Sequence, residues 1–187
     1  MRNWIMGVTL CCALCVPAAS VAAQGAASSN PMSGWLRGNF LHGKNYVAKA
    51  AEAVPEELYG MRPGPQEEVR TFGQLVGHLA NFNYLFCSDA KGEKDPAKDH
   101  DYEKLSSKTE LIKALNASFS YCDGVYAGMT DASLAETISA TTDDGKKVPS
   151  IRLARLVTNI SHNQEHYGNM VTYMRIKSMV PPSSMRP

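Results

Sequence analysis

The sequence lacks an excess of either charge, since its 187 residues contain 19 lysines and arginines and 18 aspartates and glutamates. It also lacks a run of basic residues, and a surface that binds nucleic acid needs such a run or a basic excess. We therefore expect no nucleic-acid partner. No internal repeat with a period of about 20 to 50 residues is present, which argues against solenoids and propellers. The apolar content of 44% is too high for a disordered chain.

Long apolar runs are also missing. The run at 5–16 is shorter than the roughly 20 residues of a membrane-spanning helix, and no later stretch is long enough. Arg2 precedes this run and the small residues Ala22 and Ala23 follow it, an order that is typical of a cleavable signal peptide. We expect residues 1–23 to be removed. The mature protein would be periplasmic or secreted, without a membrane span.

Cysteine is scarce in the expected mature chain. Three of the five cysteines lie in residues 1–23, so only Cys87 and Cys122 remain. An even number of cysteines in an oxidising compartment permits one disulfide. Two buried thiols are the alternative reading of the same pair.

What the sequence does contain is helical periodicity. Two capping boxes, Thr71 with Gln74 and Ser107 with Glu110, mark helix starts. Apolar residues recur at helical spacing in four segments, which are 32–53, 71–90, 107–129 and 151–177. Four helices without a long strand predict an all-α four-helix bundle. We assign 24–31 to a flexible leader, 32–178 to the bundle and 179–187 to a C-terminal tail. A small hairpin around Asp144-Gly145 is possible before the last helix.

Two histidines on the last expected helix carry the main chemical signal. His162 and His166 are four residues apart and so lie about one turn apart on the same side of a helix. Both imidazoles could then reach one metal ion at about 2.0 to 2.1 Å. Solvated or hydrogen-bonded histidines show the same spacing, so the pair alone is weak evidence for a metal.

A third ligand would have to be His42, His78 or His100. His100 lies in a charged connection, and no pattern supports His42. If the second and last helices run antiparallel, His78 and His162 both lie about three turns from the same end of the bundle. His78, His162 and His166 all lie to the side of the apolar stripes on their helices. They are therefore either half-exposed polar residues or ligands of a metal in a solvent-accessible groove between helices.

The chain resembles the DinB/YfiT-like superfamily over nearly the whole expected mature sequence. The stretches that carry the resemblance are 59–65 (YGMRPGP), 70–80 (RTFGQLVGHLA), 162–168 (HNQEHYG) and 171–173 (VTY). The resemblance implies a four-helix bundle in an up-down-down-up arrangement. It also implies a divalent metal, zinc or nickel, held by His78, His162 and His166.

The resemblance carries further expectations. Relatives include thiol-dependent transferases and metal-dependent hydrolases, and they are often dimeric, so a homodimer is possible. The related thiol transferases are cytoplasmic, whereas we expect this protein to be exported. This difference argues against a small thiol as its cosubstrate. In such a bundle Cys87 and Cys122 come to similar heights on parallel helices, where they form either a disulfide or two buried thiols.

Other polar residues could serve the site. Glu165 is the nearest acid in sequence and the candidate catalytic base, although its side chain points away from the histidines on a helix. Asn81 and Asn163 could orient ligands or substrate. Residues 162–166 also match the H-x-x-E-H pattern of some metallopeptidases. A metallopeptidase of this kind requires an acidic metal ligand later in the chain. Residues 167–187 contain no Asp or Glu, so this interpretation is the weaker one.

Two functional hypotheses follow. The first is a metal-dependent hydrolase or group (thiol) transferase that acts on an unknown small molecule. The second is a non-catalytic, exported metal-binding or stress-related protein. A concave, partly apolar pocket beside the metal would favour the enzyme. A closed shell of four protein ligands would favour the binding protein.

Overall fold

A computed structural model of the chain describes residues 29–142 and 144–185. The expected signal peptide, residues 1–23, and most of the expected leader lie outside the described residues. Among the described residues, no helix combines the length and the apolar character that a membrane crossing requires.

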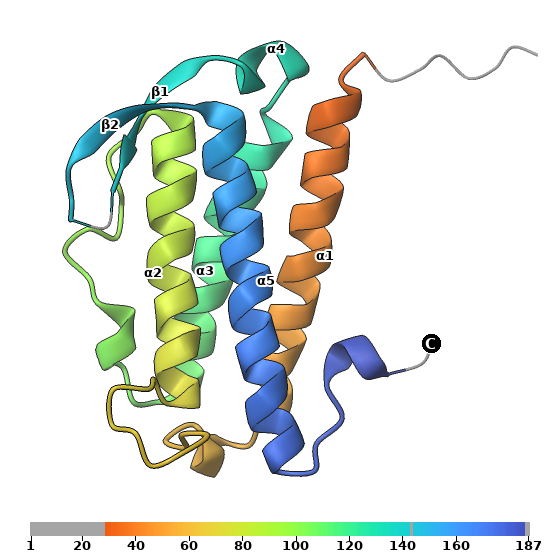
Figure 1. The fold of residues 1–187 in the computed structure, drawn as a ribbon, viewed down its shortest axis with the longest axis vertical. Coiled ribbons are helices and arrows are strands. Elements are labelled where there is room, and N and C mark those ends of the chain that lie inside the picture. The colour runs from red at the N-terminus through yellow and green to blue at the C-terminus, as the bar shows by residue number, and fades with distance from the viewer. Residues whose placement is uncertain (1–28, 143, 186–187) are drawn as a thin grey trace, which may run out of the picture.

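Four long helices pack side by side and account for most of the described chain (Figure 1). They are α1 (Pro31–Ala53), α2 (Phe72–Lys91), α3 (Lys108–Ala127) and α5 (Arg152–Ile176). Helices α1 and α5 run in one direction, and α2 and α3 run in the other. The predicted four-helix bundle with its up-down-down-up arrangement is therefore confirmed.

The helix starts follow from the sequence. The Thr71 side chain accepts a hydrogen bond from the Gln74 amide, and the Gln74 side chain accepts one from the Thr71 amide, so α2 begins with a complete capping box. The Ser107 side chain accepts from the Glu110 amide at the start of α3, which is one half of the expected box. Helix α2 ends at Gly92, whose φ of 79° suits glycine.

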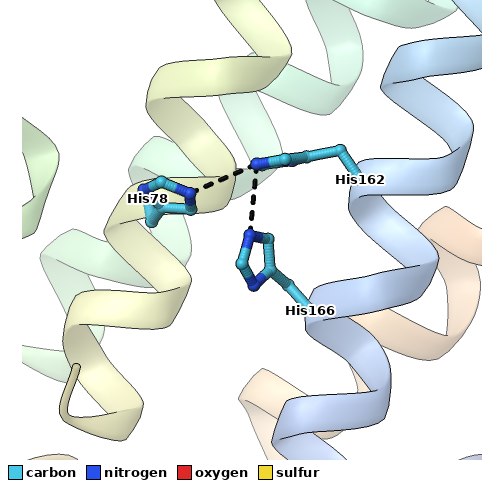
Figure 2. Close-up of side chains that lie close together, drawn as sticks. All are labelled: His78, His162 and His166. Atoms are coloured by element: carbon cyan, nitrogen blue, oxygen red, sulfur yellow. Dashed lines mark hydrogen bonds between the residues drawn. The ribbon is translucent and has the colours of Figure 1, made fainter. Parts of the chain in front are cut away.

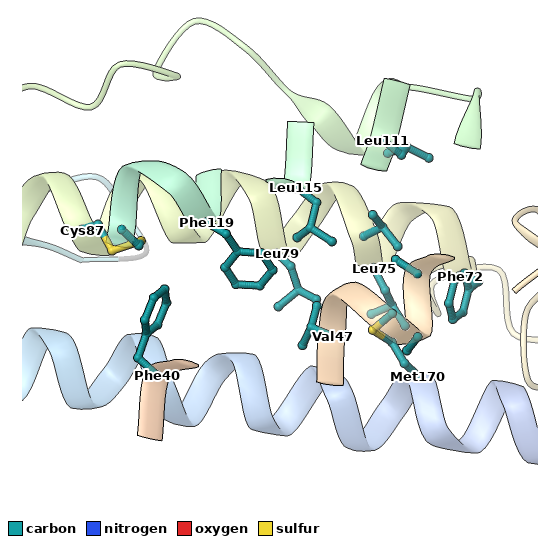
Figure 3. Packing of buried hydrophobic residues seen from close by; sticks show 14 of the residues in the cluster. Phe40, Val47, Phe72, Leu75, Leu79, Cys87, Leu111, Leu115, Phe119 and Met170 are labelled. Carbon is teal, nitrogen blue, oxygen red and sulfur yellow. A yellow bond between two sulfur atoms is a disulfide. The ribbon is translucent and has the colours of Figure 1, made fainter. Parts of the chain in front are cut away.

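The core lies between the four helices (Figure 3). Its largest fully buried side chains include Phe72 and Leu79 from α2, Phe119 from α3 and Met170 from α5. Cys87 and Cys122 are joined by a disulfide that links α2 to α3, with their Cα atoms 5.5 Å apart. The two helices run in parallel, which brings the two cysteines to the same height.

A hairpin connects α3 to α5 after the short helix α4 (Asp131–Leu134). Its strands, β1 (Thr137–Thr141) and β2 (Lys147–Ile151), pair antiparallel, and Gly145 takes a φ of 79° in the turn between them. The predicted small hairpin is thus present. Buried Asp89 near the end of α2 fastens it, since its carboxylate accepts from Thr141 and from Lys147 Nζ.

Three short 3₁₀ helices complete the described elements, namely η1 (Glu56–Leu58), η2 (Tyr102–Lys104) and η3 (Pro182–Ser184). The η3 segment, in the expected tail, folds back on α5, where the Ser183 amide donates to Tyr167 Oη at 2.9 Å. The η2 segment lies within the long connection between α2 and α3. This segment packs against α2 and contributes to the site described next.

Candidate metal centre

Three histidine rings converge between α2 and α5 (Figure 2). His78 extends from α2, and His162 and His166 extend from successive turns of α5. His78 and His166 are 6% and 8% exposed, and His162 is partly buried. The structure thus brings together the three histidines that the sequence singled out. The other two, His42 and His100, are exposed and lie outside this cluster.

The distances within the cluster suit a shared metal ion. His162 Nε2 lies 3.2 Å from His78 Nε2 and 3.2 Å from His166 Nε2. Nitrogen ligands placed about 2.0 to 2.1 Å from an ion at tetrahedral angles are about 3.3 to 3.4 Å apart. Two of the three nitrogen pairs therefore lie close to the separation that a tetrahedral zinc-type site requires, and all three nitrogens lie within 4.8 Å of one another.

Burial keeps these imidazoles neutral. Loss of solvation lowers the pKa of His162 to about 3, with the neighbouring rings His166 and His78 adding to the effect. Loss of solvation likewise lowers the pKa of His166 to about 4 and lowers the pKa of His78. Neutral imidazole is the form that binds a metal, so the rings are ready to act as ligands near neutral pH.

The outer nitrogens of two rings are held by other side chains. His78 Nδ1 lies 2.7 Å from Glu103 Oε1. A carboxylate can only accept, so the proton of neutral His78 lies on Nδ1 and the lone pair on Nε2 faces the cluster. The Asn169 amide lies 3.2 Å from His166 Nδ1, and rotation of this amide presents its oxygen to a ring N–H.

This hydrogen bonding also tests whether the site fits a cation. When Nδ1 of both His78 and His166 carries the proton, both Nε2 atoms direct lone pairs at His162 Nε2. Neutral His162 could offer one proton to only one of them. A cation shared by the three lone pairs engages all three Nε2 atoms at once. The donor set of three imidazoles fits zinc or nickel by its chemistry.

Glu103 reaches His78 because a glycine precedes that histidine. A Cβ atom at Gly77 would lie only 2.3 Å from the carbonyl oxygen of Tyr102 and 2.7 Å from the Glu103 amide nitrogen. Only glycine allows the backbone of η2 to approach α2 this closely. Asn81 supports the same approach, since its side-chain oxygen accepts from the Tyr102 amide and its nitrogen donates to Asp101. Asn81 thus holds the segment that carries Glu103.

His162 is positioned by packing. Its Nδ1 atom is buried without a hydrogen-bond partner among the described residues. Its ring lies 4.9 Å from the Phe82 ring and 5.3 Å from the Phe86 ring, measured between centroids. The two phenylalanines therefore cover one side of the cluster with apolar surface.

Asn163 is fully buried and faces α2. Its Nδ2 donates to Asn83 Oδ1, which also accepts from Asn159 Nδ2. These hydrogen bonds join α2 to α5 beside the cluster. They therefore fix the position of His78 along the bundle axis relative to the two histidines on α5. The structure places Asn163 in this link between helices.

Glu165 is exposed on α5, and its carboxylate forms no hydrogen bond or ion pair with any described residue. Its negative charge still acts to raise the pKa of His166 and of His78, against the larger effect of burial. The acid that contacts a ring nitrogen is instead Glu103. The structure does not bring Glu165 into contact with the cluster.

A cavity of about 270 Å³ opens beside His166. Its other walls include Arg70, Asn169, Leu75 and Tyr173. Arg70 Nε donates to Glu103 Oε2 at 2.9 Å, so the same carboxylate links Arg70 to His78. The cluster is thus bordered by a small pocket of mixed polar and apolar character.

Three contributors to the site were not singled out from the sequence. Glu103 lies in a charged connection, where nothing in the sequence marks one acid above the others. Asn169 follows His166 by three residues on α5, and this spacing is the one available signal for a partner on the same helix face. Gly77 stands directly before His78, but its role depends on a loop that packs against it.

Comparisons with known proteins bear on the family and the fold of the chain. The sequence profile described as the DinB superfamily matches residues 40–170, which is more than half of the chain. No curated protein matches the chain in sequence. Among solved structures, a DinB-like protein from Bacillus cereus has a TM-score of 0.64 at 16% identity, covering 79% of this chain and 93% of its own. A DinB-like protein from Bacillus subtilis has a TM-score of 0.61 at 22% identity, covering 81% and 99%.

A mycothiol-dependent maleylpyruvate isomerase shares the fold, with a TM-score of 0.55 at 15% identity. The match covers 74% of this chain and 60% of the isomerase, so the chain corresponds to only part of that enzyme. At these identities the structural matches establish the fold alone. Together with the profile match over most of the bundle, they show that the chain belongs to the DinB superfamily.

Proposed function

We propose that the protein is an exported, metal-dependent hydrolase or group transferase that acts on a small molecule. His78, His162 and His166 hold its divalent ion, which is zinc or nickel. The observation that carries the proposal is the convergence of three neutral Nε2 atoms, two pairs of which are 3.2 Å apart.

An ion held by three imidazoles supplies a Lewis acid and an activated water or thiolate nucleophile. The chain's own residues prepare the site for such an ion. Glu103 holds the proton of His78 on Nδ1 and so keeps Nε2 available. Phe82 and Phe86 exclude water from the side of His162. Substrate would enter from the cavity beside His166.

The cavity favours an enzyme over a non-catalytic metal store. A protein that only stores or uses its ion structurally needs no pocket at a ligand, whereas a reaction needs a space for substrate. In addition, the described residues contribute three histidines to the cluster without a fourth acidic, histidine or cysteine ligand. This leaves a coordination position for a reactant.

The disulfide between Cys87 and Cys122 supports export. Structural disulfides persist in oxidising compartments and are rare in the cytosol. This agrees with the signal peptide proposed for residues 1–23. A thiol-dependent transfer is the less favoured branch of the proposal, since the mycothiol dependence belongs to a neighbour with 15% identity. The metallopeptidase alternative is weaker still, because the exposed Glu165 would have to act as its base.

Metal analysis tests the proposal directly. The protein is purified without chelator or nickel resin, and bound metals are measured for the wild type and for His162→Ala. We expect about one zinc or nickel ion per wild-type chain and almost none in the variant. His42→Ala is the matched control, because His42 is exposed on α1 and lies outside the cluster. Equal metal content in His162→Ala and the wild type would refute the site.

Activity is then measured on a panel of small esters, amides and thiol-acceptor compounds. The wild type is assayed as purified, after chelation and after metal is restored. We expect a turnover that chelation removes and metal restores. A metal-loaded protein that turns over none of these compounds would favour the non-catalytic alternative.

A further inference from the structure

The cavity beside His166 contains one cationic group with unused hydrogen-bond donors. Arg70 lines the cavity and donates from Nε to Glu103 Oε2. Its two Nη groups form no hydrogen bond with any residue in the described part of the chain. The guanidinium of Arg70, an exposed residue that lines the cavity, therefore keeps donors available.

Apart from Glu68, the other polar side chains of the cavity already make hydrogen bonds with described residues. The hydroxyl of Tyr173 donates to the Arg70 carbonyl oxygen, and the hydroxyl of Thr172 donates to the Gly168 carbonyl oxygen. The Asn169 amide contacts His166 Nδ1. The two Nη groups of Arg70 are thus the charged donors that remain for a ligand among the described residues of the cavity wall. A planar guanidinium with two free NH₂ groups matches the two oxygens of a carboxylate.

Part of the cavity wall is apolar. Pro63, Val69 and Leu75 line it together with the polar residues. Its volume of about 270 Å³ lies slightly below the range of drug-sized ligand pockets. A ligand of this site is therefore small and carries a short apolar part beside its charged group.

We infer that the cavity binds small carboxylates with a short aliphatic chain, and that Arg70 holds the carboxylate while the rest of the molecule lies toward His166. This inference rests on the proposed function, because it names the substrate class of the same site. It assigns Arg70 two contacts, one to the ligand and one to Glu103, which supports His78. Binding of the carboxylate and support of the metal ligand would thus share one arginine.

Glu68 bears on the inference because it also lines the cavity and makes no hydrogen bond or ion pair with a described residue. Its negative charge opposes an anionic ligand. The inference therefore predicts opposite effects at two neighbouring positions. Removing the charge of Arg70 weakens carboxylate binding, and removing the charge of Glu68 strengthens it.

The test uses butyrate and its neutral analogue butyramide as probes. Binding is followed by ¹H–¹⁵N NMR titration of the full mature protein, both as purified with its metal and after chelation. We expect butyrate to shift the backbone resonances of Asn169 and Thr172 in a saturable way, with at least tenfold higher affinity than butyramide. We expect this preference in the metal-free protein as well, where the carboxylate cannot bind to an ion.

Three variants complete the test. Arg70→Gln should weaken butyrate binding at least tenfold, and Glu68→Gln should strengthen it. Arg62→Gln is the matched control, since Arg62 bonds to the Val69 carbonyl oxygen but does not line the cavity, and it should bind butyrate like the wild type. Circular dichroism and urea unfolding of each variant separate a lost contact from a lost fold.

The inference is overturned if butyrate and butyramide bind equally, if neither binds, or if Arg62→Gln loses as much affinity as Arg70→Gln. It is also overturned if butyrate binds only to the metal-loaded protein and Arg70→Gln has no effect, because the ion alone would then explain binding.

Metal content is measured on the same samples. Loss of metal in His162→Ala with unselective butyrate binding in the wild type would refute the inference and leave the metal site intact. Absence of metal with selective butyrate binding would refute the proposed function instead.

Discussion

The imidazole of His78 and the carboxylate of Glu103 are in direct contact, with Nδ1 and Oε1 2.7 Å apart. The two residues come from different elements, since His78 is on α2 and Glu103 is on η2 in the connection that follows it. Acid groups that accept from the outer nitrogen of a metal-binding histidine fix its tautomer and raise its basicity. The contact therefore suggests that the connection between α2 and α3 takes part in the site.

Replacing Glu103 tests this role. In Glu103→Gln the amide can no longer supply a negative charge, so we expect metal affinity to fall roughly tenfold to hundredfold. Competition with a chromophoric zinc chelator measures the change. Glu165→Gln is the matched control, because Glu165 is exposed and bonds to none of the described residues. An affinity loss in Glu165→Gln as large as that in Glu103→Gln would contradict the assignment.

The same pair of variants addresses the catalytic role expected for Glu165. If Glu165 is the general base, Glu165→Gln keeps its metal but loses turnover of a substrate found in the activity screen. If it is only a surface residue, turnover stays near the wild-type value. We expect the second result, since the structure does not bring its carboxylate into contact with the histidines. Rates at fixed metal loading decide between the two.

A substitution at Gly77 should disturb the site through the backbone. A methyl group there would clash with the Tyr102 carbonyl oxygen, so Gly77→Ala should push η2 away from α2 and separate Glu103 from His78. We expect weaker metal binding and a free energy of unfolding lower by about 1 to 3 kcal/mol. Gly124→Ala is the control on α3, because a Cβ atom there meets nothing within 4 Å. That variant should be neutral or slightly stabilised. Equal behaviour of the two variants would contradict the proposed close approach.

The bundle could be predicted because its signals are local. The Thr71 capping box fixes the start of α2, and apolar spacing gives each long helix to within a few residues. The burial of α5 was harder to predict, because this helix packs against both α1 and α2. Its polar residues Asn159 and Asn163 are buried toward α2, whereas apolar Val157 is 45% exposed. The apolar stripe therefore does not mark the most buried side of this helix.

The site could be predicted only in its histidines. His162 and His166 share a helix, so their spacing placed them on the same side of it. The positions of two antiparallel helices supported His78 as the third member, and the resemblance to the DinB/YfiT-like superfamily implied it. Glu103 could not be found in this way. Its position depends on how an irregular connection folds over Gly77, which is a tertiary contact without a periodic signal. Arg70 was part of a recognised motif, but its link to Glu103 likewise needed the fold.

The metal-free protein should lose stability in mild acid. The pKa of His162 is lowered to about 3 and that of His166 to about 4, below the value of about 6.5 in an unfolded chain. Between these values the unfolded chain binds more protons than the folded protein, so the free energy of unfolding falls as the pH drops from about 6.5 toward 4.

Urea unfolding at pH 7 and pH 5 measures this effect after chelation. His162→Gln has one titrating group fewer in the cluster, so its loss of stability over this range should be smaller than that of the wild type by roughly 2 kcal/mol. His42→Gln is the control for an imidazole outside the cluster. The explanation fails if His162→Gln and the wild type show the same pH dependence.

The disulfide should stabilise the bundle without contributing to metal binding. It joins positions 35 residues apart, and closing a loop of this length removes about 3 to 4 kcal/mol of chain entropy from the unfolded state. We expect the protein reduced and alkylated in denaturant, then refolded, to unfold at a clearly lower urea concentration than the oxidised protein. Cys87 lies about 13 Å along α2 from His78, and its partner is on α3. The refolded protein should therefore keep its metal stoichiometry, and a loss of metal on reduction, with the helical content retained, would show that the disulfide also positions the histidines.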